Sequence, residues 1–443
     1  MKARVHFTEQ LRGSLKPPSS KNYTTRYLLV AALAEGESVI HHPAQSQDAD
    51  ALRACLLELG AGIREEIDDD GGRHLHVHGF GGRPTNPGVL NVGNAGAVAR
   101  MLMGVGALLS ELRVETPFPE SLGQRPHDEL FSGLEQLGAS VDSTGGRLPA
   151  TIRGGTLHGG TIRISGSRSS QFLSSLLLLS PLVGEDVRIE ITDELISQPL
   201  VHTTMEVMRQ AGVVVSAGDD MMSFHIAAGQ SYHAGEFSVN GDWPSAAAIL
   251  AAGAITSSGI IVERLYEDRQ GERAVLALLR QMGVDVSWDG ARVELRGHNG
   301  LRGCDFDGDL ATDAVLAMLP VAAHAEGTSR FYGIGNLRYK ECDRILVPVN
   351  ELRRFGVDCH EEKEAIVIRG CPDGYAGGHD AATFHDHRVA QMQALMGLRS
   401  RDGVVVLDAE TVGKSYPDFF GDLVSLGARI ELETPSYSTL APV

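Results

Sequence analysis

The sequence contains no apolar run that approaches the ~18 residues a membrane-spanning helix needs, so we expect no membrane partner. Its start, MKARVHFTEQ, lacks the features of a secretory signal peptide. The 443 residues include five cysteines, none of which form a CxxC pair, and this argues against a disulfide framework and against a zinc ribbon. These absences together predict a cytoplasmic protein.

An excess of positive charge is also missing. The chain has 39 Lys and Arg against 57 Asp and Glu, a formal net charge of −18, which argues against nucleic acid as a partner of the whole surface. The negative net charge does not exclude an anion site formed by a local cluster of Lys and Arg. At roughly 150 residues per domain, the length predicts two or three domains.

A repeated unit organises the chain. Six helix-like stretches each end at a glycine, and a short β-branched run usually follows, as expected where glycine closes a helix in the left-handed conformation. The six glycines lie 71 to 78 residues apart, at Gly60, Gly138, Gly212, Gly283, Gly356 and Gly427.

A second helix in each unit begins near a polar residue suited to helix capping. These residues recur every 71 to 75 positions, at Asn22, Asn94, Ser169, Asp242, Asp313 and Asp386. Each unit therefore reads β-α-β-α-β-β, and the sixth lacks its last strand. We predict that the N-terminal strand closes the sixth unit and that two domains of three units form, 21–240 and 241–443 with 1–20. An open solenoid of six units is the alternative.

Basic and polar side chains gather at the predicted helix starts, where unpaired N–H groups and partial positive charge favour anions. They include Lys21, Arg26, Asn94, Arg100, Arg168, Ser169, Ser170, Gln171, Asp313, His387 and Arg388. Three further segments add Arg125, the group Lys340, Glu341 and Arg344, and Lys414. The arginines predict an anionic ligand, whereas simple capping and a solvated salt-bridge face are the alternatives.

Metal binding has weak support. His74, His76 and His78 alternate along one predicted strand and could share a zinc ion, but a polar outer face of a hairpin accounts for them better. We expect no metal site.

Eight segments together resemble the successive signatures of the 5-enolpyruvylshikimate-3-phosphate synthase family of enolpyruvyl transferases. They are SSKNYTTRYLLVAALAEG, NVGNAGAVARMLMG, GQRPHDEL, GSRSSQFLSSLLLLSPL, GDWPSAAAILAAGAI, TDAVLAMLPVAAHAEGTSRFYGIGNLRYKECDR, FHDHRVA and GKSYPDFF. The resemblance implies an inside-out α/β barrel fold in two domains, each of three β-α-β-α-β-β repeats. It also implies transfer of enolpyruvyl from phosphoenolpyruvate to the 5-hydroxyl of shikimate 3-phosphate, with no metal or organic cofactor. A monomer is our expectation.

The resemblance also implies site residues. Shikimate 3-phosphate would meet Lys21, Asn22, Arg26, Ser169, Ser170, Gln171, Ser197, Asp313, Asn336 and Lys340. Phosphoenolpyruvate would meet Lys21, Asn94, Gly96, Arg125, Gln171, Arg344, Arg388 and Lys414. Asp313 would be the base and Glu341 the acid, with Lys21 assisting proton transfer.

Some positions differ from the family pattern. Asn22 follows Lys21, as in the sister enzymes that act on UDP-N-acetylglucosamine, and SQPL places Gln198 and Leu200 near the expected shikimate ring. Ala97 and Met101 predict reduced sensitivity to glyphosate, which occupies the phosphoenolpyruvate site in the family. Two alternatives remain: enolpyruvyl transfer to UDP-N-acetylglucosamine, and a non-catalytic repeat scaffold that binds anions.

Overall fold

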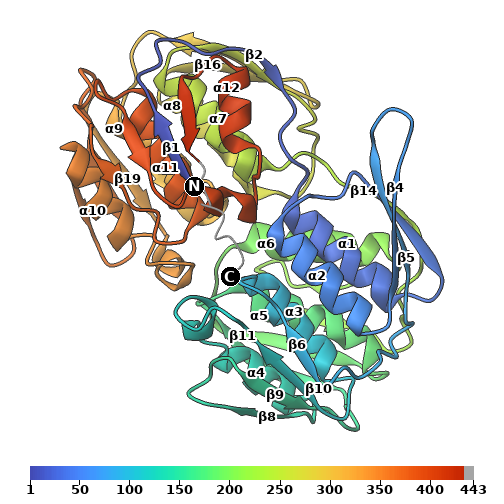
Figure 1. Ribbon diagram of the computed structural model, residues 1–443. Coiled ribbons are helices and arrows are strands. Elements are labelled where there is room, and N and C mark those ends of the chain that lie inside the picture. Colours follow the sequence, from blue (N-terminus) through green and yellow to red (C-terminus); the bar gives the residue numbers. More distant parts are fainter. Residues whose placement is uncertain (434–443) are drawn as a thin grey trace, which may run out of the picture. The chain divides into compact units, whose positions relative to one another are not determined.

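The computed structural model describes residues 1–433 and divides into two compact units (Figure 1). The N-terminal unit comprises Pro18–Trp243 and Leu265–Gly271. The C-terminal unit comprises Met1–Pro17, Pro244–Arg264 and the chain from Glu272 onward. The segment 265–271, which the repeat pattern places in the second domain, groups with the N-terminal unit. Gln270 accounts for this, since its side chain donates to the Gly241 carbonyl (3.0 Å).

The N-terminal unit contains the first three repeats. Its elements are α1 (Lys21–Leu33), β3 (Glu37–His41), α2 (Gln47–Glu58), β4 (Gly62–Ile67), β5 (Arg73–His78), β6 (Val89–Asn91), α3 (Gly96–Gly106), β7 (Leu112–Glu115), α4 (Asp128–Gln136), β8 (Ser140–Ser143), β9 (Ala150–Arg153), β10 (Gly160–Gly166), α5 (Ser170–Leu179), β11 (Val187–Leu195), α6 (Gln198–Gln210), β12 (Ser216–Ala217), β13 (Ser223–Ile226) and β14 (Glu236–Ser238). The strands form three four-stranded sheets, in the orders β14-β3-β5-β4, β6-β7-β9-β8 and β10-β11-β13-β12.

The C-terminal unit repeats this plan. Its elements are β1 (Lys2–Val5), β2 (Arg12–Leu15), α7 (Trp243–Ile255), β15 (Gly259–Val262), α8 (Val275–Gln281), β16 (Val284–Trp288), β17 (Val293–His298), β18 (Asp305–Asp307), α9 (Val315–Ala323), β19 (Thr328–Tyr332), α10 (Leu346–Phe355), β20 (Asp358–Glu361), β21 (Ile366–Arg369), β22 (Asp380–Ala381), α11 (His387–Leu398), β23 (Val404–Val406), α12 (Phe419–Ser425) and β24 (Ile430–Glu433). Its sheets have the orders β2-β15-β17-β16, β18-β19-β21-β20 and β22-β23-β1-β24.

All six sheets share one topology, and the predicted six-repeat α/β fold is confirmed. A parallel pair forms one edge, and the other two pairs are antiparallel. β1 occupies the position that the last strand of a repeat takes in the other five sheets, between β23 and β24. The missing last strand of the sixth repeat is thus supplied by the N-terminus.

The repeat glycines close helices as the sequence predicts. All six have φ between 90° and 104°, the left-handed region in which a β-carbon is unfavourable. At Gly356, the backbone N–H bonds back to the Arg353 carbonyl and so satisfies the end of α10. The even spacing of these glycines in the sequence therefore reflects six equivalent helix ends.

The predicted caps at the second helices are realised only in part. Ser169 caps α5 and Asp386 caps α11, each accepting from the backbone N–H two residues later. Asn22 instead lies inside α1, and Ala95 and Ala314 hold the cap positions of α3 and α9 without a side-chain bond. Side-chain capping therefore does not account for the polar residues at every start.

Helices α1, α3, α5, α9 and α11, which we call the central helices, form much of the core. Every residue of α9 and α11 is buried, and in α1, α3 and α5 all residues but one are buried. The strands alternate buried and exposed side chains, as β10 and β19 do. Each unit therefore buries whole helices and leaves one face of each sheet to the solvent.

Glycines after the last strand of a repeat allow that strand to approach the end of a central helix. A β-carbon on Gly79, Gly154 or Gly370 would collide with carbonyl oxygens at the end of α1, α3 or α9. The sheets thus cover the C-terminal ends of these helices directly.

We predict that Gly154→Ala lowers the free energy of unfolding by about 2 kcal/mol or more, because the added methyl meets the backbone oxygens of Ala107 and Leu109. Gly155→Ala is the matched control, since its β-carbon would meet no atom within 4 Å. Urea unfolding of both variants measures the difference. Equal stability of the two would contradict the packing argument.

Candidate active site

In the N-terminal unit, the central helices open to the solvent only at their first turns. One residue in each helix is partly exposed, and all the others are buried: Lys21 in α1, Ala97 in α3 and Gln171 in α5. Two of these three are predicted ligand residues. The exposed helix starts therefore form the part of the unit in which a ligand could meet backbone N–H groups and polar side chains.

Arg100 links two of the helix starts. Its Nη1 donates to Ser169 Oγ (3.2 Å) and to Gln171 Oε1 (2.7 Å), both at the start of α5. The guanidinium carbon lies 4.8 Å from the ring centroid of Phe172. The buried guanidinium thus orders the first turn of α5.

Arg125 lies beside the start of α3. It is buried, and a β-carbon built on Gly96 would lie 2.6 Å from its Nη1. The absence of a side chain at Gly96 therefore lets the guanidinium approach the helix N-terminus. The guanidinium adds its charge to the partial positive charge of the helix N-terminus, so this part of the unit favours anions.

Lys21 and Arg26 both lie on α1 but differ in environment. Lys21 Nζ pairs with Asp48 Oδ2 at 3.0 Å, and Asp48 lies in the first turn of α2. Arg26 is 1% exposed and donates from Nε to Thr204 Oγ1 (2.8 Å) and from Nη1 to the Asn22 carbonyl (2.9 Å). Burial lowers the pKa of Arg26 to about 10.

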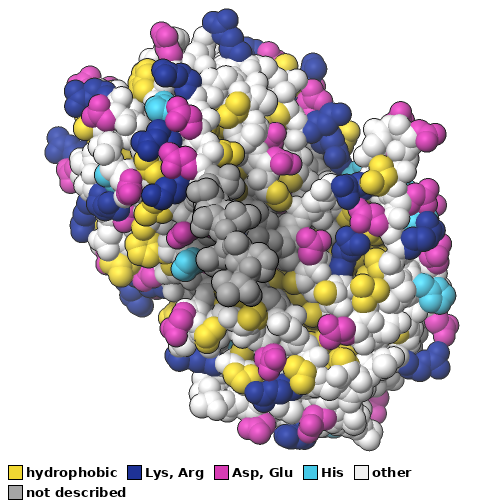
Figure 2. Space-filling view, in the orientation of Figure 1, with side chains coloured by type: hydrophobic (Ala, Val, Ile, Leu, Met, Phe, Trp, Pro, Cys, Tyr) yellow, Lys and Arg dark blue, Asp and Glu magenta, His cyan; other side chains and the backbone are white. Residues whose placement is uncertain are grey.

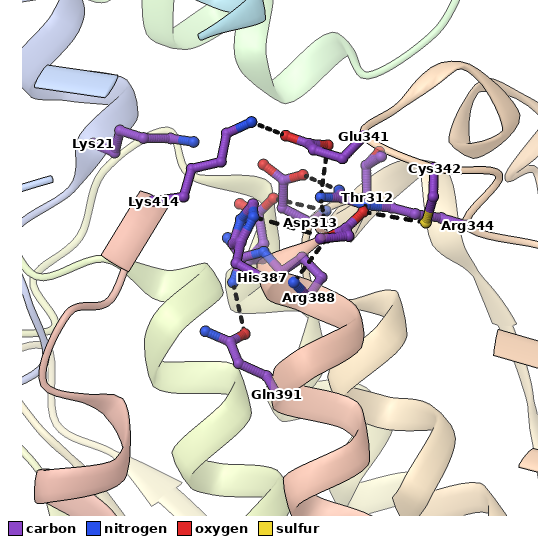
Figure 3. A network of polar contacts seen from close by, with 12 residues as sticks. Lys21, Thr312, Asp313, Glu341, Cys342, Arg344, His387, Arg388, Gln391 and Lys414 are labelled. Atoms are coloured by element: carbon purple, nitrogen blue, oxygen red, sulfur yellow. Dashed lines mark hydrogen bonds and ion pairs between the residues drawn. The ribbon is translucent and has the colours of Figure 1, made fainter. Parts of the chain in front are cut away.

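In the C-terminal unit, one guanidinium contacts three carboxylates. Arg344 contacts Asp386 through Nε (2.7 Å), Glu341 through Nη2 (2.8 Å) and Asp313 through Nη1 (3.5 Å). Lys414 Nζ pairs with the other oxygen of Glu341 at 2.6 Å (Figure 3). Two of the predicted cations, Arg344 and Lys414, therefore lie in one connected network with the predicted acid and base.

Arg344, Asp386 and Lys414 are the buried members of this network. Desolvation by burial lowers the pKa of Arg344, but Asp386 and Glu341 outweigh it and raise the pKa above its ordinary value. Asp386 is fully buried, and its Oδ1 also accepts from the Arg388 N–H (2.8 Å) at the start of α11. Burial, followed by Asp386, raises the pKa of the Cys342 thiol, which suits a packing role for Cys342.

Five further predicted ligand residues lie in helices or directly beside them. Ser170 is buried in the first turn of α5, and Ser197 precedes α6 with φ of 50°. Asn336 is buried in the 3-10 helix Gly335–Tyr339, which Lys340 follows. Arg388 is buried in α11 and donates from Nη1 to Gln391 Oε1 (3.3 Å).

Sequence reasoning missed two buried residues in these clusters. Asp48 follows a helix cap at Ser46, so its sequence context indicates capping and gives no sign of its partner Lys21. His127 lies in the QRPHDEL segment, and its ring packs beside Arg100, which is 27 positions away on another element. Lys21 and Asp48 are also 27 positions apart, and contacts at this separation leave no local signal.

The residues that the structure describes contain no cluster of His, Cys, Asp or Glu that could hold a metal ion. His76 pairs instead with Glu66 (2.9 Å) across the outer strands β4 and β5, in line with the polar-hairpin interpretation. Within residues 1–433, no helix is long and apolar enough to cross a bilayer. On the face in Figure 2, Lys and Arg lie among Asp and Glu without a continuous basic stripe.

The fold and these residues define a six-repeat α/β enzyme of two units, with cation-lined starts to its central helices. The chain belongs to the family described as EPSP synthase (3-phosphoshikimate 1-carboxyvinyltransferase), whose model matches residues 5–423.

Individual relatives agree with this assignment. The chain is 42% identical to the 3-phosphoshikimate 1-carboxyvinyltransferase of Deinococcus radiodurans over 96% of each chain. It is 36% identical to the enzyme of that name from Methanosarcina acetivorans, over 95% of this chain and 97% of the relative. The solved EPSP synthase of Acinetobacter baumannii superposes with a TM-score of 0.80 at 25% identity, covering 98% of this chain and 99% of that one.

We predict that Gly96→Ala raises the KM for phosphoenolpyruvate about tenfold, the cost of disturbing one charge-assisted contact. The added methyl displaces the Arg125 guanidinium, a flexible side-chain end, so the melting temperature should stay close to that of the wild type. Gly421→Ala serves as control, because its β-carbon would meet no atom within 4 Å. An unchanged KM in Gly96→Ala would show that the position of Arg125 does not matter for this substrate.

Proposed function

We propose that this protein carries out the reaction of its family. It transfers the enolpyruvyl group of phosphoenolpyruvate to the 5-hydroxyl of shikimate 3-phosphate and releases phosphate, a step in aromatic amino-acid biosynthesis. The family match over residues 5–423 and the relative that is 42% identical support this function. The contacts of Arg344 with Asp313 and Glu341 are the single structural observation that carries the mechanism.

The two substrates each carry a phosphate and a carboxylate, which explains buried cations in an acidic protein. We assign the phosphate of shikimate 3-phosphate to Ser169, Ser170 and Ser197. We assign phosphoenolpyruvate to a set of cations that share burial and a place near a helix start or the Arg344 network: Arg125, Arg344, Arg388 and Lys414. Arginine suits these oxygens because its planar fork donates two parallel hydrogen bonds.

The chemistry requires proton transfer in two directions. Asp313 accepts the proton of the 5-hydroxyl as that oxygen bonds to C2 of phosphoenolpyruvate, and Glu341 donates a proton to the methylene carbon. The tetrahedral intermediate then loses phosphate by cleavage of the bond between C2 and the phosphate oxygen, and the phosphate takes the proton that Asp313 had accepted. Glu341 takes back a proton from the new methyl group, which restores the double bond. The enolpyruvyl group is transferred with no change of oxidation state, so no oxidant or reductant is needed, and we propose no metal or organic cofactor.

The ionic contacts of Glu341 must weaken before this carboxylate can take up a proton and act as an acid. Its two oxygens pair with Arg344 and Lys414, and both cations favour the ionised carboxylate. The phosphate and carboxylate of phosphoenolpyruvate compete for the same cations. Substrate binding would therefore weaken the hold on Glu341 and favour its protonated form, in which it can donate. We also assign Lys21 a role in assisting proton transfer.

The transfer to UDP-N-acetylglucosamine is not favoured. The matched family and the relatives are named for 3-phosphoshikimate. The loop FPESLGQRPHDEL, at residues 118–130, also lacks the cysteine that the sister enzymes usually carry in the first domain. We further propose a cytoplasmic monomer. The five cysteines form no disulfide in residues 1–433, which suits a reducing compartment, and light scattering would measure the mass.

Measuring phosphate release tests directly which molecule accepts the enolpyruvyl group. With phosphoenolpyruvate and shikimate 3-phosphate we expect turnover, and with phosphoenolpyruvate and UDP-N-acetylglucosamine we expect none above the level without acceptor. Release with the nucleotide sugar alone would identify the sister activity, and release with neither would leave the anion-binding scaffold as the better description.

Asp313→Ala and Glu341→Ala should each reduce kcat by about 10²-fold or more, the usual contribution of a general acid or base. Glu326→Ala is a control in the same unit, because Glu326 is exposed. Steady-state kinetics with circular dichroism of each variant provides the measurement. A folded variant with near-wild-type kcat would remove the corresponding role.

A further inference from the structure

A buried histidine lies behind the proposed substrate contacts of the N-terminal unit. His127 immediately precedes α4 and is 0% exposed. Its backbone N–H donates to the Gly146 carbonyl (2.8 Å), and its carbonyl accepts from the Phe131 N–H (3.0 Å). The ring packs against Phe131 and Phe172, with centroid distances of 5.9 Å and 6.4 Å. Backbone and ring are therefore both fixed in place.

The ring nitrogen of His127 faces an arginine. Arg100 Nε lies 3.5 Å from Nδ1 of His127. Because a guanidinium has only donors, Nδ1 must be the acceptor and the ring proton must be on Nε2. Burial, followed by Arg100 and Arg125, lowers the pKa of His127 well below its ordinary value, which keeps the ring neutral.

Nη1 of the same guanidinium fixes the hydrogen-bonding orientation of two predicted ligand residues, Gln171 and Ser169. Gln171 must turn its carbonyl oxygen toward Arg100 Nη1, so its amide NH2 is directed elsewhere. Ser169 Oγ accepts from Arg100 (3.2 Å) and from the Gln171 N–H (3.3 Å), so its own hydrogen is available to donate. Both side chains are thereby set as donors, which is what an anionic ligand requires.

We propose that His127 is a positioning residue: it holds Arg100 in the orientation that makes Ser169 a hydrogen-bond donor to the phosphate of shikimate 3-phosphate and leaves the Gln171 amide free to donate to the rest of that ligand. The proposal rests on the proposed function for the identity of the ligand. His127 itself touches no substrate. Its effect reaches the ligand through one buried guanidinium, and it concerns the phosphate more than the rest of the molecule.

Two substitutions separate positioning from packing. In His127→Asn, the amide oxygen can occupy the place of Nδ1 and accept from Arg100, whereas in His127→Gln the amide reaches the place of Nε2 and the acceptor at Nδ1 is lost. Isothermal titration with shikimate 3-phosphate and with shikimate, which lacks the phosphate, gives the readout.

We expect His127→Gln to weaken binding of shikimate 3-phosphate about tenfold or more, since the ligand loses well-aligned charge-assisted hydrogen bonds. Binding of shikimate should change less than about threefold, and kcat at saturating substrate should stay within the same range, because the altered hydrogen bonds concern the phosphate. His127→Asn should remain close to the wild type for both ligands. Circular dichroism verifies that each variant is folded.

Three results would overturn the proposal. Equal losses in the Asn and Gln variants would mean that His127 acts by packing alone, and so would equal losses for shikimate and its phosphate ester. Unchanged binding in His127→Gln would show that Arg100 needs no acceptor there. If the Gln variant fails to fold, Arg100→Lys replaces it: the lysine keeps the charge but cannot span His127 and α5, and the same selective loss is expected.

Failure of the proposed function is distinguishable from these results. A wild-type protein that binds shikimate 3-phosphate without turning it over contradicts the reaction, while the affinity ratio of the two ligands in His127→Gln still tests positioning. A wild-type protein that does not discriminate shikimate 3-phosphate from shikimate contradicts both.

Discussion

The structure depends on helices that are buried along their whole length. Such a helix satisfies its backbone hydrogen bonds internally except at its two ends, and the two ends have different surroundings in this structure. The C-terminal carbonyls of α1, α3 and α9 lie against strands that approach them through Gly79, Gly154 and Gly370. The N-terminal turns of α1, α3 and α5 hold the partly exposed residues of those helices. A ligand that binds to these helices must therefore meet their N-termini, and that geometry selects anions.

Much of this organisation could be predicted from the sequence because it is periodic. Glycines at helix ends recur with each repeat, and their left-handed conformation is a local requirement that a sequence reveals. The shared topology of the six sheets follows from the same repetition. The place of β1 between β23 and β24 could be inferred because the sixth repeat lacks a strand. The parallel partners of β2 and β14 could not be inferred. β2 pairs with β15 instead of with β3, the next strand in the chain, and β14 pairs with β3 instead of with β15, because a strand gives no sign of which parallel neighbour it will find.

The site was predictable in its residue types and unpredictable in its pairings. Charge at a helix start indicated Lys21, and two further charged segments indicated Arg344 and Lys414, but the partners of Lys21 and Lys414 come from other segments. Asp48 pairs with Lys21 across two helices, and Glu341 pairs with Lys414 across more than 70 positions. A buried cation requires a counter-charge or several acceptors, since the cost of desolvation is large. The sequence shows the cations, and the fold decides which groups satisfy them.

The carboxylates around Arg344 are not equivalent, and the difference bears on their roles. Asp386 is fully buried, accepts from Arg344 through both oxygens and also caps α11. Removing it would leave a buried guanidinium and a helix start unsatisfied, so it is suited to a fixed anchor. Glu341 pairs with Arg344 and Lys414, and Asp313 is the most exposed of the three side chains at 19%. In the proposed mechanism, an anionic substrate would replace Glu341 or Asp313 at Arg344 while Asp386 keeps the guanidinium oriented. Acid and base catalysis beside a bound anion requires this difference between fixed and exchangeable carboxylates.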